Sequence, residues 1–420
     1  MTARRRFLQG IGATLLHSAA ASILSVSDAH AGLPANAQVE YGQDTLLAGI
    51  RSRLIDNNNG ARMHILEAGF EEPGRPCVIL LHGFPELAYT WRKQLLPLAR
   101  AGFHVIAPDL RGYGRSSGTD IKFDDDILSF SLLNHVSDTL GLVSALGIEK
   151  VQAIAGHDWG APMAAWCALV RPDVFRSVVL MSTPFGGAPA LPFDTANRAA
   201  RSSGEGDIQK ALTALSPPRK HYWWYCASRE ANGDMWHAPQ GVHDLLRANF
   251  HVKSADWKGN KPVALKSWTA SELAKMPRYY VMDLGKGMAE TVAAEMPTKA
   301  QIAECKWLTE AELRVYSAEY QRTGFQGGLQ SYRVLIDPRY EGELNAFAGR
   351  RIDVPALFIA GASEWGPYQT PGALQAMRGG ACTKLKGVHF VEGAGHWPGE
   401  EQPVKVNDLL IEFLRSARSA

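Results

Sequence analysis

The sequence lacks the features of a nucleic-acid-binding protein and of a metalloprotein. Its 420 residues hold 44 Lys and Arg and 42 Asp and Glu, giving a net charge of +2, and no basic run follows residue 6. A basic surface for nucleic acid is therefore not predicted. The five cysteines form no CxxC pair and show no metal-ligand spacing, so we expect buried free thiols, no metal and no cofactor.

The N-terminal segment has no apolar run long enough to form a stable membrane span. Its apolar stretch, residues 11–26, is short and interrupted by Ser, His and Gly,. Residues 4–9 (RRRFLQ) resemble the twin-arginine export signal, and residues 29–31 (AHA) form a small-x-small cleavage site,. We expect residues 1–31 to be a signal peptide, with a disordered basic N-terminus as the alternative. The mature protein would then be periplasmic or secreted, and export after folding fits its unpaired cysteines.

The composition, 46% hydrophobic and 20% charged, is that of a globular protein with two domains or with one domain that carries a large insertion. From about residue 60, short apolar strands alternate with helices, which is typical of a mostly parallel, doubly wound α/β sheet. The strands are expected at residues 63–66, 77–81, 104–107, 151–155, 177–181, 355–360 and 387–391. We predict a core of residues 32–185 and 346–420, into which residues 186–345, helical and aromatic, are inserted as a cap.

Residues 156–161 (GHDWGA) connect a buried strand to a buried helix. Because only a few residues flanked by glycine join the two elements, the turn is very sharp. Asp158 at its apex is expected in strained backbone geometry above the sheet, and the small neighbouring residues allow the strand and the helix to approach closely. A carboxylate in this position is a candidate nucleophile.

Further polar side chains follow other strands of the predicted sheet. His82, Glu364 and His396 each come shortly after a strand, as Asp158 does. Functional groups gather at the carboxyl ends of the strands in an open α/β sheet, so these four side chains are expected to face one crevice beneath the cap. The order of nucleophile, acid and histidine along the chain is that of an α/β-hydrolase.

Four motifs make the resemblance to a known family specific. They are residues 82–86 (HGFPE), 109–114 (DLRGYG), 156–161 (GHDWGA) and 395–398 (GHWP). With them, residues 60–415 resemble an epoxide hydrolase of the α/β-hydrolase fold, in the branch with an aspartate nucleophile that also contains the haloalkane dehalogenases. The resemblance implies a small apolar epoxide and water as the reactants.

An aspartate nucleophile determines the chemistry expected at this site. The Asp158 carboxylate would attack an epoxide carbon and leave an ester on the enzyme. His396, oriented by Glu364, would activate the water that hydrolyses this ester. The backbone N–H groups of Phe84 and Trp159 would hold the oxyanion, and both residues are expected to contact the substrate. In the family, the peptide bond between Phe84 and the next proline is often cis.

The resemblance also implies two cap tyrosines that protonate the alkoxide of the opened epoxide. Tyr332, in residues 327–333 (GGLQSYR), corresponds to the second of them. The first belongs to residues 221–225 (HYWWY), where we choose Tyr222 over Tyr225.

Several residues depart from the family pattern or imitate another one. The family usually has Asp at the position of Glu364, so the loop must accommodate an extra methylene group. The alternative acid, Asp353, precedes the strand and would lie at the wrong end of the sheet. Residues 114–118 (GRSSG) match the serine-hydrolase pattern GxSxG, but they neither follow a strand directly nor begin an apolar helix, so they predict a loop. His82 and His157 are expected to fix loops through hydrogen bonds.

Two other functions fit the same fold. A haloalkane dehalogenase uses the same Asp–His chemistry, but it generally has Asn or Trp where Phe84 stands and lacks the paired cap tyrosines. A non-catalytic binding protein usually lacks a member of the triad, whereas Asp158, Glu364 and His396 are all present. We therefore favour the hydrolysis of epoxides to vicinal diols.

Overall fold

A computed structural model describes residues 41–42, 44–190 and 208–418. The predicted signal peptide, residues 1–31, lies outside this part of the chain. Residues 41–420 form a single compact unit. No helix in the described ranges is long and apolar enough to cross a membrane.

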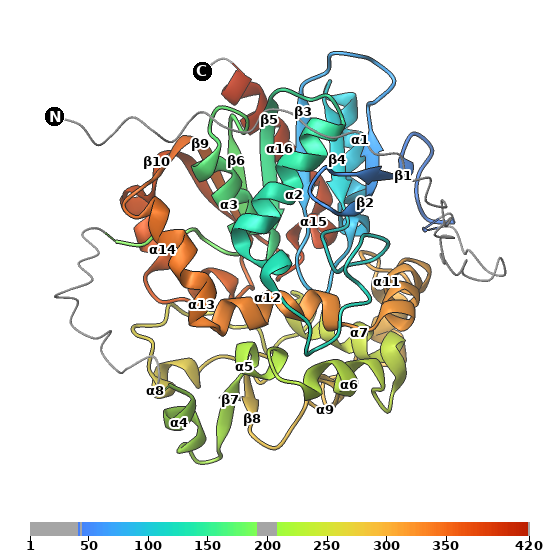
Figure 1. Ribbon diagram of the computed structural model, residues 1–420. Coiled ribbons are helices and arrows are strands. Elements are labelled where there is room, and N and C mark those ends of the chain that lie inside the picture. Colours follow the sequence, from blue (N-terminus) through green and yellow to red (C-terminus); the bar gives the residue numbers. More distant parts are fainter. Residues whose placement is uncertain (1–40, 43, 191–207, 419–420) are drawn as a thin grey trace, which may run out of the picture. The chain divides into compact units, whose positions relative to one another are not determined.

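A mixed sheet of eight strands, in the order β1-β2-β4-β3-β5-β6-β9-β10, runs through the core (Figure 1). The strands are β1 (Arg51–Asp56), β2 (Arg62–Ala68), β3 (Cys77–Leu81), β4 (His104–Pro108), β5 (Val151–His157), β6 (Val178–Met181), β9 (Ile352–Gly361) and β10 (Cys382–Val391). Neighbours from β4 to β10 pair in parallel, whereas β1–β2 and β2–β4 are antiparallel. The predicted mostly parallel α/β sheet is confirmed.

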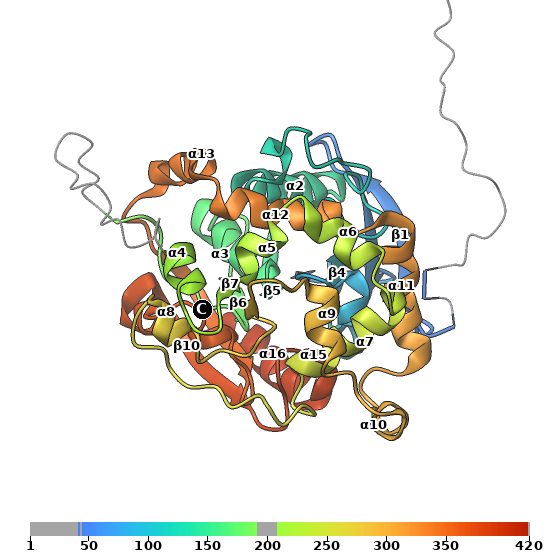
Figure 2. The ribbon, with the colours of Figure 1, turned by 90° about the horizontal axis from the view of Figure 1, so that it is seen from below.

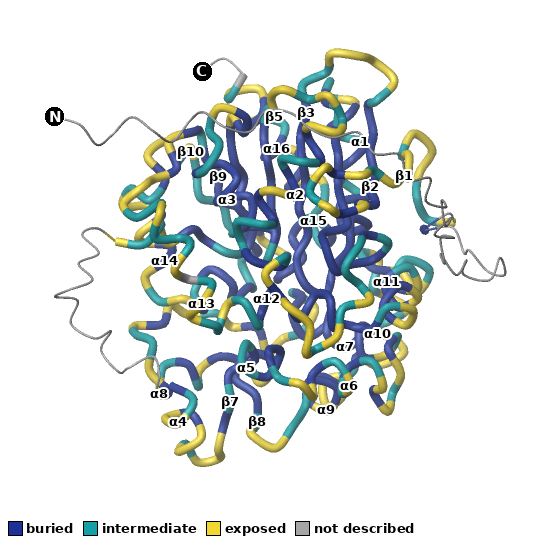
Figure 3. Tube along the Cα trace, in the orientation of Figure 1, coloured by how far each residue is buried: buried dark blue, intermediate teal, exposed yellow. Residues whose placement is uncertain are grey.

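Nearly every residue of the central strands β3, β5 and β6 is buried, because helices cover both faces of the sheet,. Helices α2 (Leu132–Ala145) and α3 (Gly160–Val170) pack together, and so do α1 (Arg92–Arg100) and α16 (Pro403–Arg418). The two pairs lie on opposite faces of the sheet (Figure 1). In Figure 3 the central strands are accordingly buried. Four of the five cysteines are also buried and all five are free, as expected.

Strand β1 is missing from the predicted strands. Its sequence, RSRLID, has no apolar run, and it pairs at the sheet edge with its side chains mostly exposed or half-buried. Between β4 and β5, a 3₁₀ turn, η2 (Leu128–Phe130), precedes helix α2. Helix α2 starts afresh after Ser131, whose side chain accepts a hydrogen bond from the Asn134 N–H as an N-cap,.

Between β6 and β9, the described residues are mostly helical and lie across one end of the sheet (Figures 1 and 2). Their helices are α4 (Ile208–Thr213), α5 (Tyr222–Cys226), α6 (Glu230–Trp236), α7 (Gly241–Lys253), α8 (Ala270–Leu273), α9 (Met288–Ala293), α10 (Lys299–Glu304), α11 (Glu310–Thr323), α12 (Gln326–Ile336), α13 (Pro338–Glu341) and η3 (Gly342–Phe347). A capping box of Thr309 and Glu312 opens α11. A short antiparallel pair, β7 (Arg219–His221) and β8 (Val281–Asp283), was not predicted.

Short elements complete the core around the carboxyl ends of the strands. They are η1 (Ala88–Trp91), η4 (Gly366–Tyr368), α14 (Ala373–Ala376), η5 (Met377–Ala381) and α15 (Pro398–Glu401). The loop after β3 carries Phe84, whose ring meets the rings of three aromatic residues of the cap. The carboxyl ends of the strands therefore face the cap.

Candidate active site

Asp158 lies in the sharp turn between β5 and α3. Its backbone φ of 50° is in the left-handed region, which a residue with a side chain rarely adopts,. The turn needs glycine on both sides. A Cβ atom at Gly156 would lie 1.9 Å from the carbonyl oxygen of Gly160, and one at Gly160 would lie 2.2 Å from the carbonyl oxygen of Leu81. The strand and the helix can approach this closely only without those side chains.

The Asp158 carboxylate is held between two groups from distant parts of the chain. Its Oδ1 accepts a hydrogen bond of 3.0 Å from the backbone N–H of Phe84. Its Oδ2 lies 3.5 Å from Nε2 of His396. The Phe84–Pro85 peptide bond is cis, as the resemblance implies. One carboxylate oxygen is thus fixed by the backbone, and the other faces the imidazole.

His396 is oriented by Glu364. Its Nδ1 donates a hydrogen bond of 2.6 Å to Glu364 Oε1, and both side chains are buried. Because Nδ1 carries the proton in this bond, the lone pair of the neutral ring is on Nε2. That atom is buried and has no hydrogen-bond partner among the described residues. It is therefore available to a water molecule beside Asp158.

The loop after β9 accommodates the longer side chain of Glu364 through a glycine. A Cβ atom at Gly366 would lie 2.5 Å from Glu364 Oε1. The other carboxylate oxygen, Oε2, accepts a hydrogen bond of 3.2 Å from the backbone N–H of Gly361. Asp353, in contrast, is exposed at the start of β9 and accepts a hydrogen bond from Thr383.

The electrostatic surroundings keep Asp158 ionised. Burial by itself would raise the pKa of its carboxyl group, but His396 when its ring is protonated, together with Lys253 and His157, holds that pKa well below its usual value,. Burial also raises the pKa of the phenols of Tyr222 and Tyr332 well above 10. The site therefore combines an anionic carboxylate with two protonated hydroxyl groups.

The two cap tyrosines chosen from the sequence lie together near this carboxylate. Tyr222 begins α5, and Tyr332 lies in α12, with ring centroids 5.8 Å apart. The ring of Tyr332 also meets those of Trp159, at 5.2 Å, and Phe84, at 5.6 Å. Tyr225 points elsewhere and donates a hydrogen bond to Asp234. The structure thus places Tyr222, and not Tyr225, beside Tyr332.

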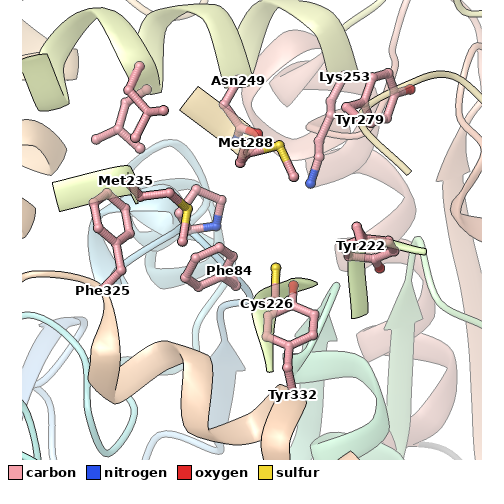
Figure 4. Close-up of a pocket in the computed structure, with 13 residues that line it drawn as sticks. Phe84, Tyr222, Cys226, Met235, Asn249, Lys253, Tyr279, Met288, Phe325 and Tyr332 are labelled. Carbon is pink, nitrogen blue, oxygen red and sulfur yellow. The ribbon is translucent and has the colours of Figure 1, made fainter. Parts of the chain in front are cut away.

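A cavity lies between the cap and the core (Figure 4). Most of its wall is apolar or aromatic. The lining residues are Phe84, Pro85, Tyr222, Cys226, Met235, Leu245, Leu246, Asn249, Lys253, Tyr279, Met288, Phe325 and Tyr332. Asn249 and Lys253 were not identified from the sequence, because a helical segment gives no sign of which polar side chains turn inward.

A buried ion pair between His157 and Glu86 lies next to the turn that holds Asp158. His157 Nδ1 donates to Glu86 Oε2 at 2.6 Å, and Nε2 donates to the carbonyl oxygen of His396 at 2.7 Å. Burial opposes the charge, but Glu86 outweighs it and raises the pKa of His157 to about 9. His82 also fixes loops, since it bonds the carbonyl oxygen of Gly83 and the N–H of Leu110. The sequence-based reading of both histidines agrees with these contacts.

The GxSxG segment does not form a second nucleophile. Ser116 is buried, and its hydroxyl donates a hydrogen bond of 2.6 Å to the carbonyl oxygen of Asp109 while accepting one from the N–H of His64.

Within the described part of the chain, no cluster of His, Cys, Asp and Glu could hold a metal ion.

The chain is similar to known epoxide hydrolases in both sequence and structure. The family model for the alpha/beta hydrolase fold matches residues 76–220. The chain is 33% identical to epoxide hydrolase A of Mycobacterium tuberculosis over 86% of its own length and 96% of that protein. It is 32% identical to epoxide hydrolase 3 of Siraitia grosvenorii, over 85% and 96% of the two chains. Among solved structures, an epoxide hydrolase from an endophytic Streptomyces superposes with a TM-score of 0.69 at 31% identity, covering 89% of this chain and 98% of the other.

Proposed function

The chain belongs to the epoxide hydrolases of the α/β-hydrolase fold, and from this premise we propose how its residues open an epoxide to a vicinal diol. The observation that carries the proposal is the Asp158 carboxylate, which lies between the Phe84 N–H and the His396 imidazole. Two protonated phenols, Tyr222 and Tyr332, line the adjoining cavity. This arrangement combines a nucleophile, a base and a pair of acids in one site.

In the first step, Asp158 Oδ2 attacks an epoxide carbon and the C–O bond of the ring breaks. The oxygen leaves as an alkoxide, a poor leaving group unless it receives a proton. Tyr332 hydrogen-bonds this oxygen, and so does Tyr222 once its hydroxyl turns from Gln369 Oε1, to which it donates a hydrogen bond of 3.1 Å in the structure; one of the two phenols supplies the proton. Asp158 Oδ1, already bonded to the Phe84 N–H, becomes the carbonyl oxygen of the ester.

In the second step, His396 Nε2 takes a proton from water, and the resulting hydroxide attacks the ester carbon. Glu364 stabilises the imidazolium that forms, because it accepts the hydrogen bond from Nδ1,. The negative charge that develops on Oδ1 is held by the N–H groups of Phe84 and Trp159. The ester bond then breaks, and the protons on the His396 imidazolium and the Asp158 carboxyl group pass to the departing diol oxygen and to the tyrosinate, which releases the diol and restores the carboxylate, the neutral imidazole and the phenol.

The covalent ester provides the direct test. The variant His396→Gln should be alkylated by an epoxide but hydrolyse the ester very slowly, so the intact protein gains the mass of the epoxide. Peptide mapping should place the added mass on Asp158, and Asp158→Asn in the same background should remove it. Absence of an adduct with a varied panel of epoxides would refute the mechanism.

Halogenated alkanes separate this activity from dehalogenation, which uses the same nucleophile. A halide leaves without a proton, so Tyr332→Phe should slow epoxide turnover much more than any displacement of bromide from a brominated alkane. Tyr225→Phe is the matched control, because Tyr225 bonds Asp234 away from Tyr332. Equal losses with both substrates would argue against Tyr332 as a proton donor.

We also propose that residues 1–31 direct export of the folded protein to the periplasm or beyond. The support is the sequence RRRFLQ at residues 4–9 and the AHA site at residues 29–31,. Replacing both Arg4 and Arg5 by Lys should retain the uncleaved precursor in the cytoplasmic fraction, whereas Arg6→Lys should not. Equal distribution of all three proteins between the fractions would contradict the proposal.

A further inference from the structure

Helix α7 places two hydrogen-bond donors on the wall of the cavity. Asn249 and Lys253 are four residues apart and therefore lie on the same face of the helix, one turn from each other,. Both line the cavity together with Tyr222 and Tyr332. Figure 4 shows the ammonium nitrogen of Lys253 pointing into the open space. The side chains are only 7% and 8% exposed, so bulk water does not satisfy them.

Neither donor has a hydrogen-bond partner among the residues that the structure describes. Asn249 Nδ2 is buried and has no hydrogen-bond partner within the described ranges. The Lys253 ammonium makes no hydrogen bond or ion pair to any described residue. Its contacts are with the rings of Tyr280 and Trp397, whose centroids lie 5.8 and 5.6 Å from Nζ. These distances are near the outer limit of a cation–π interaction.

A buried ammonium group without an ion-pair partner is costly to a folded protein. Burial lowers the pKa of Lys253, and the negative charge of Asp158 acts in the opposite direction,. The chain nevertheless fixes the end of α7 firmly, since the carbonyl oxygen of Lys253 accepts a hydrogen bond of 2.8 Å from the His396 N–H. Lys253 is thus held in place beside His396, where packing alone would favour an apolar residue, and Asn249 lies one turn before it in α7.

We propose that Lys253 and Asn249 bind a carboxylate carried by the substrate, so that the preferred substrates are epoxides of apolar carboxylic acids. This inference rests on the proposed function and refines the small apolar epoxide expected from the sequence. One positive charge and two donors match a monoanion with two acceptor oxygens. The hydrocarbon part of such a substrate would contact the apolar wall formed by Met235, Leu245 and Met288.

A binding experiment tests the carboxylate site without requiring turnover. Calorimetry should show that phenylacetate binds the wild-type protein roughly tenfold or more tightly than phenylacetamide, the gain expected for a charge-assisted hydrogen bond. Lys253→Met should abolish this difference, and Asn249→Leu should reduce it. Lys275→Met, which removes an exposed lysine, is the matched control. Equal affinities of the two compounds for the wild-type protein would overturn the proposal, whether or not the variants fold.

Turnover then distinguishes failure of this inference from failure of the proposed function. The substrates are a homologous series of terminal epoxides with a carboxylate at the far end, each paired with its primary amide. The ratio of kcat/KM for acid over amide should be roughly tenfold or more at the best chain length and should collapse in Lys253→Met. If both members are hydrolysed equally, or Lys253→Met slows both equally, the carboxylate site is wrong. If no epoxide is hydrolysed while phenylacetate still binds selectively, the proposed function is wrong and the site stands.

Discussion

Glu364 shows how a departure from a family pattern is compensated by a single neighbour. Its carboxylate reaches His396 at 2.6 Å despite the extra methylene group. The space comes from Gly366, where a Cβ atom would lie 2.5 Å from Oε1. The glycine two residues after the longer acid leaves the space that its carboxylate needs, and the hydrogen bond to the histidine is therefore retained.

We predict that Glu364→Gln lowers kcat by roughly 10³- to 10⁴-fold, because the amide neither fixes the tautomer of His396 nor stabilises its cation. Formation of the Asp158 ester should be much less affected than its hydrolysis. Rapid-quench mass spectrometry should therefore find the ester accumulating during turnover. Glu364→Asp keeps the charge and should retain more activity than the amide variant; a smaller loss in Glu364→Gln than in Glu364→Asp would remove Glu364 from the triad.

The His157–Glu86 pair makes stability depend on pH. Both ring nitrogens of His157 face acceptors, the Glu86 carboxylate and the His396 carbonyl oxygen, so the ring is a cation in the folded state,. Its pKa is raised from 6.5 to about 9. A group with a raised pKa in the folded state stabilises the fold fully below its unfolded pKa and loses that contribution as the pH rises through the folded value.

We therefore predict that the free energy of unfolding of the wild-type protein falls by at most about 3 kcal/mol between pH 6.5 and 9 as His157 loses its proton,. In His157→Gln this part of the slope should be absent. Urea unfolding at a series of pH values measures both curves. Parallel curves for the two proteins would show that His157 is not charged in the folded state.

At the scale of elements, the turn between β5 and α3 depends on the close approach of backbones. The strand and the helix can approach this closely only because Asp158 adopts a positive φ and glycines lie on either side of it. Within this turn, Gly160 makes the closest approach to a neighbouring strand: a Cβ atom at this position would lie 2.2 Å from the carbonyl oxygen of Leu81 at the end of β3. Backbone atoms in the middle of a sheet cannot move aside easily.

We predict that Gly160→Ala destabilises the protein by about 3 kcal/mol or prevents folding, because overpacking against backbone forces the strand and the helix apart. Gly233→Ala is the matched control. Gly233 lies within α6, nothing lies within 4 Å of its Cβ position, and the change should stabilise the protein by roughly 0.5 to 1 kcal/mol,. Denaturant unfolding measures both. Similar effects of the two substitutions would contradict this account of the turn.

At the scale of the whole molecule, buried charges join the cap to the core. Arg92, the first residue of α1, pairs with Glu312 of the cap helix α11 at 2.9 Å and with the buried Glu400 of α15. Glu400 also lies 3.2 Å from Lys93 and accepts a hydrogen bond from the cap residue Tyr316. The cavity lies between the two parts, so this network helps to set its shape.

We predict that Arg92→Met costs about 3 kcal/mol of stability, because the change leaves the Glu400 charge buried with one partner fewer. Hydrogen exchange should accelerate in α11 more than in the central strands, since the cap loses an anchor. Arg171→Met removes an exposed pair with Asp173 and should cost less than about 1 kcal/mol,. Uniform acceleration throughout the chain would show that Arg92 supports the whole fold and not the cap in particular.

The sequence alone was sufficient to predict the sheet, and local patterns singled out Asp158, Glu364 and His396 as candidate site residues, whereas Tyr332 was implied by the family resemblance. The first three are signalled locally, because a buried strand and the polar residue in the turn or loop after it are adjacent in the chain. The order of the motifs then implied that the strand ends meet, which the parallel pairing of the strands bears out.

Only the tertiary structure revealed the features that depend on contacts between distant segments. The edge strand β1 and the pair β7–β8 have no apolar run, and their pairing depends on neighbours supplied by the fold. The same holds for Lys253 and Asn249, whose place on a helix is readable but whose orientation toward the cavity is not. Local pattern singled out the candidate catalytic residues of this protein, whereas the packing of the cap against the core decided which side chains line the cavity beside them.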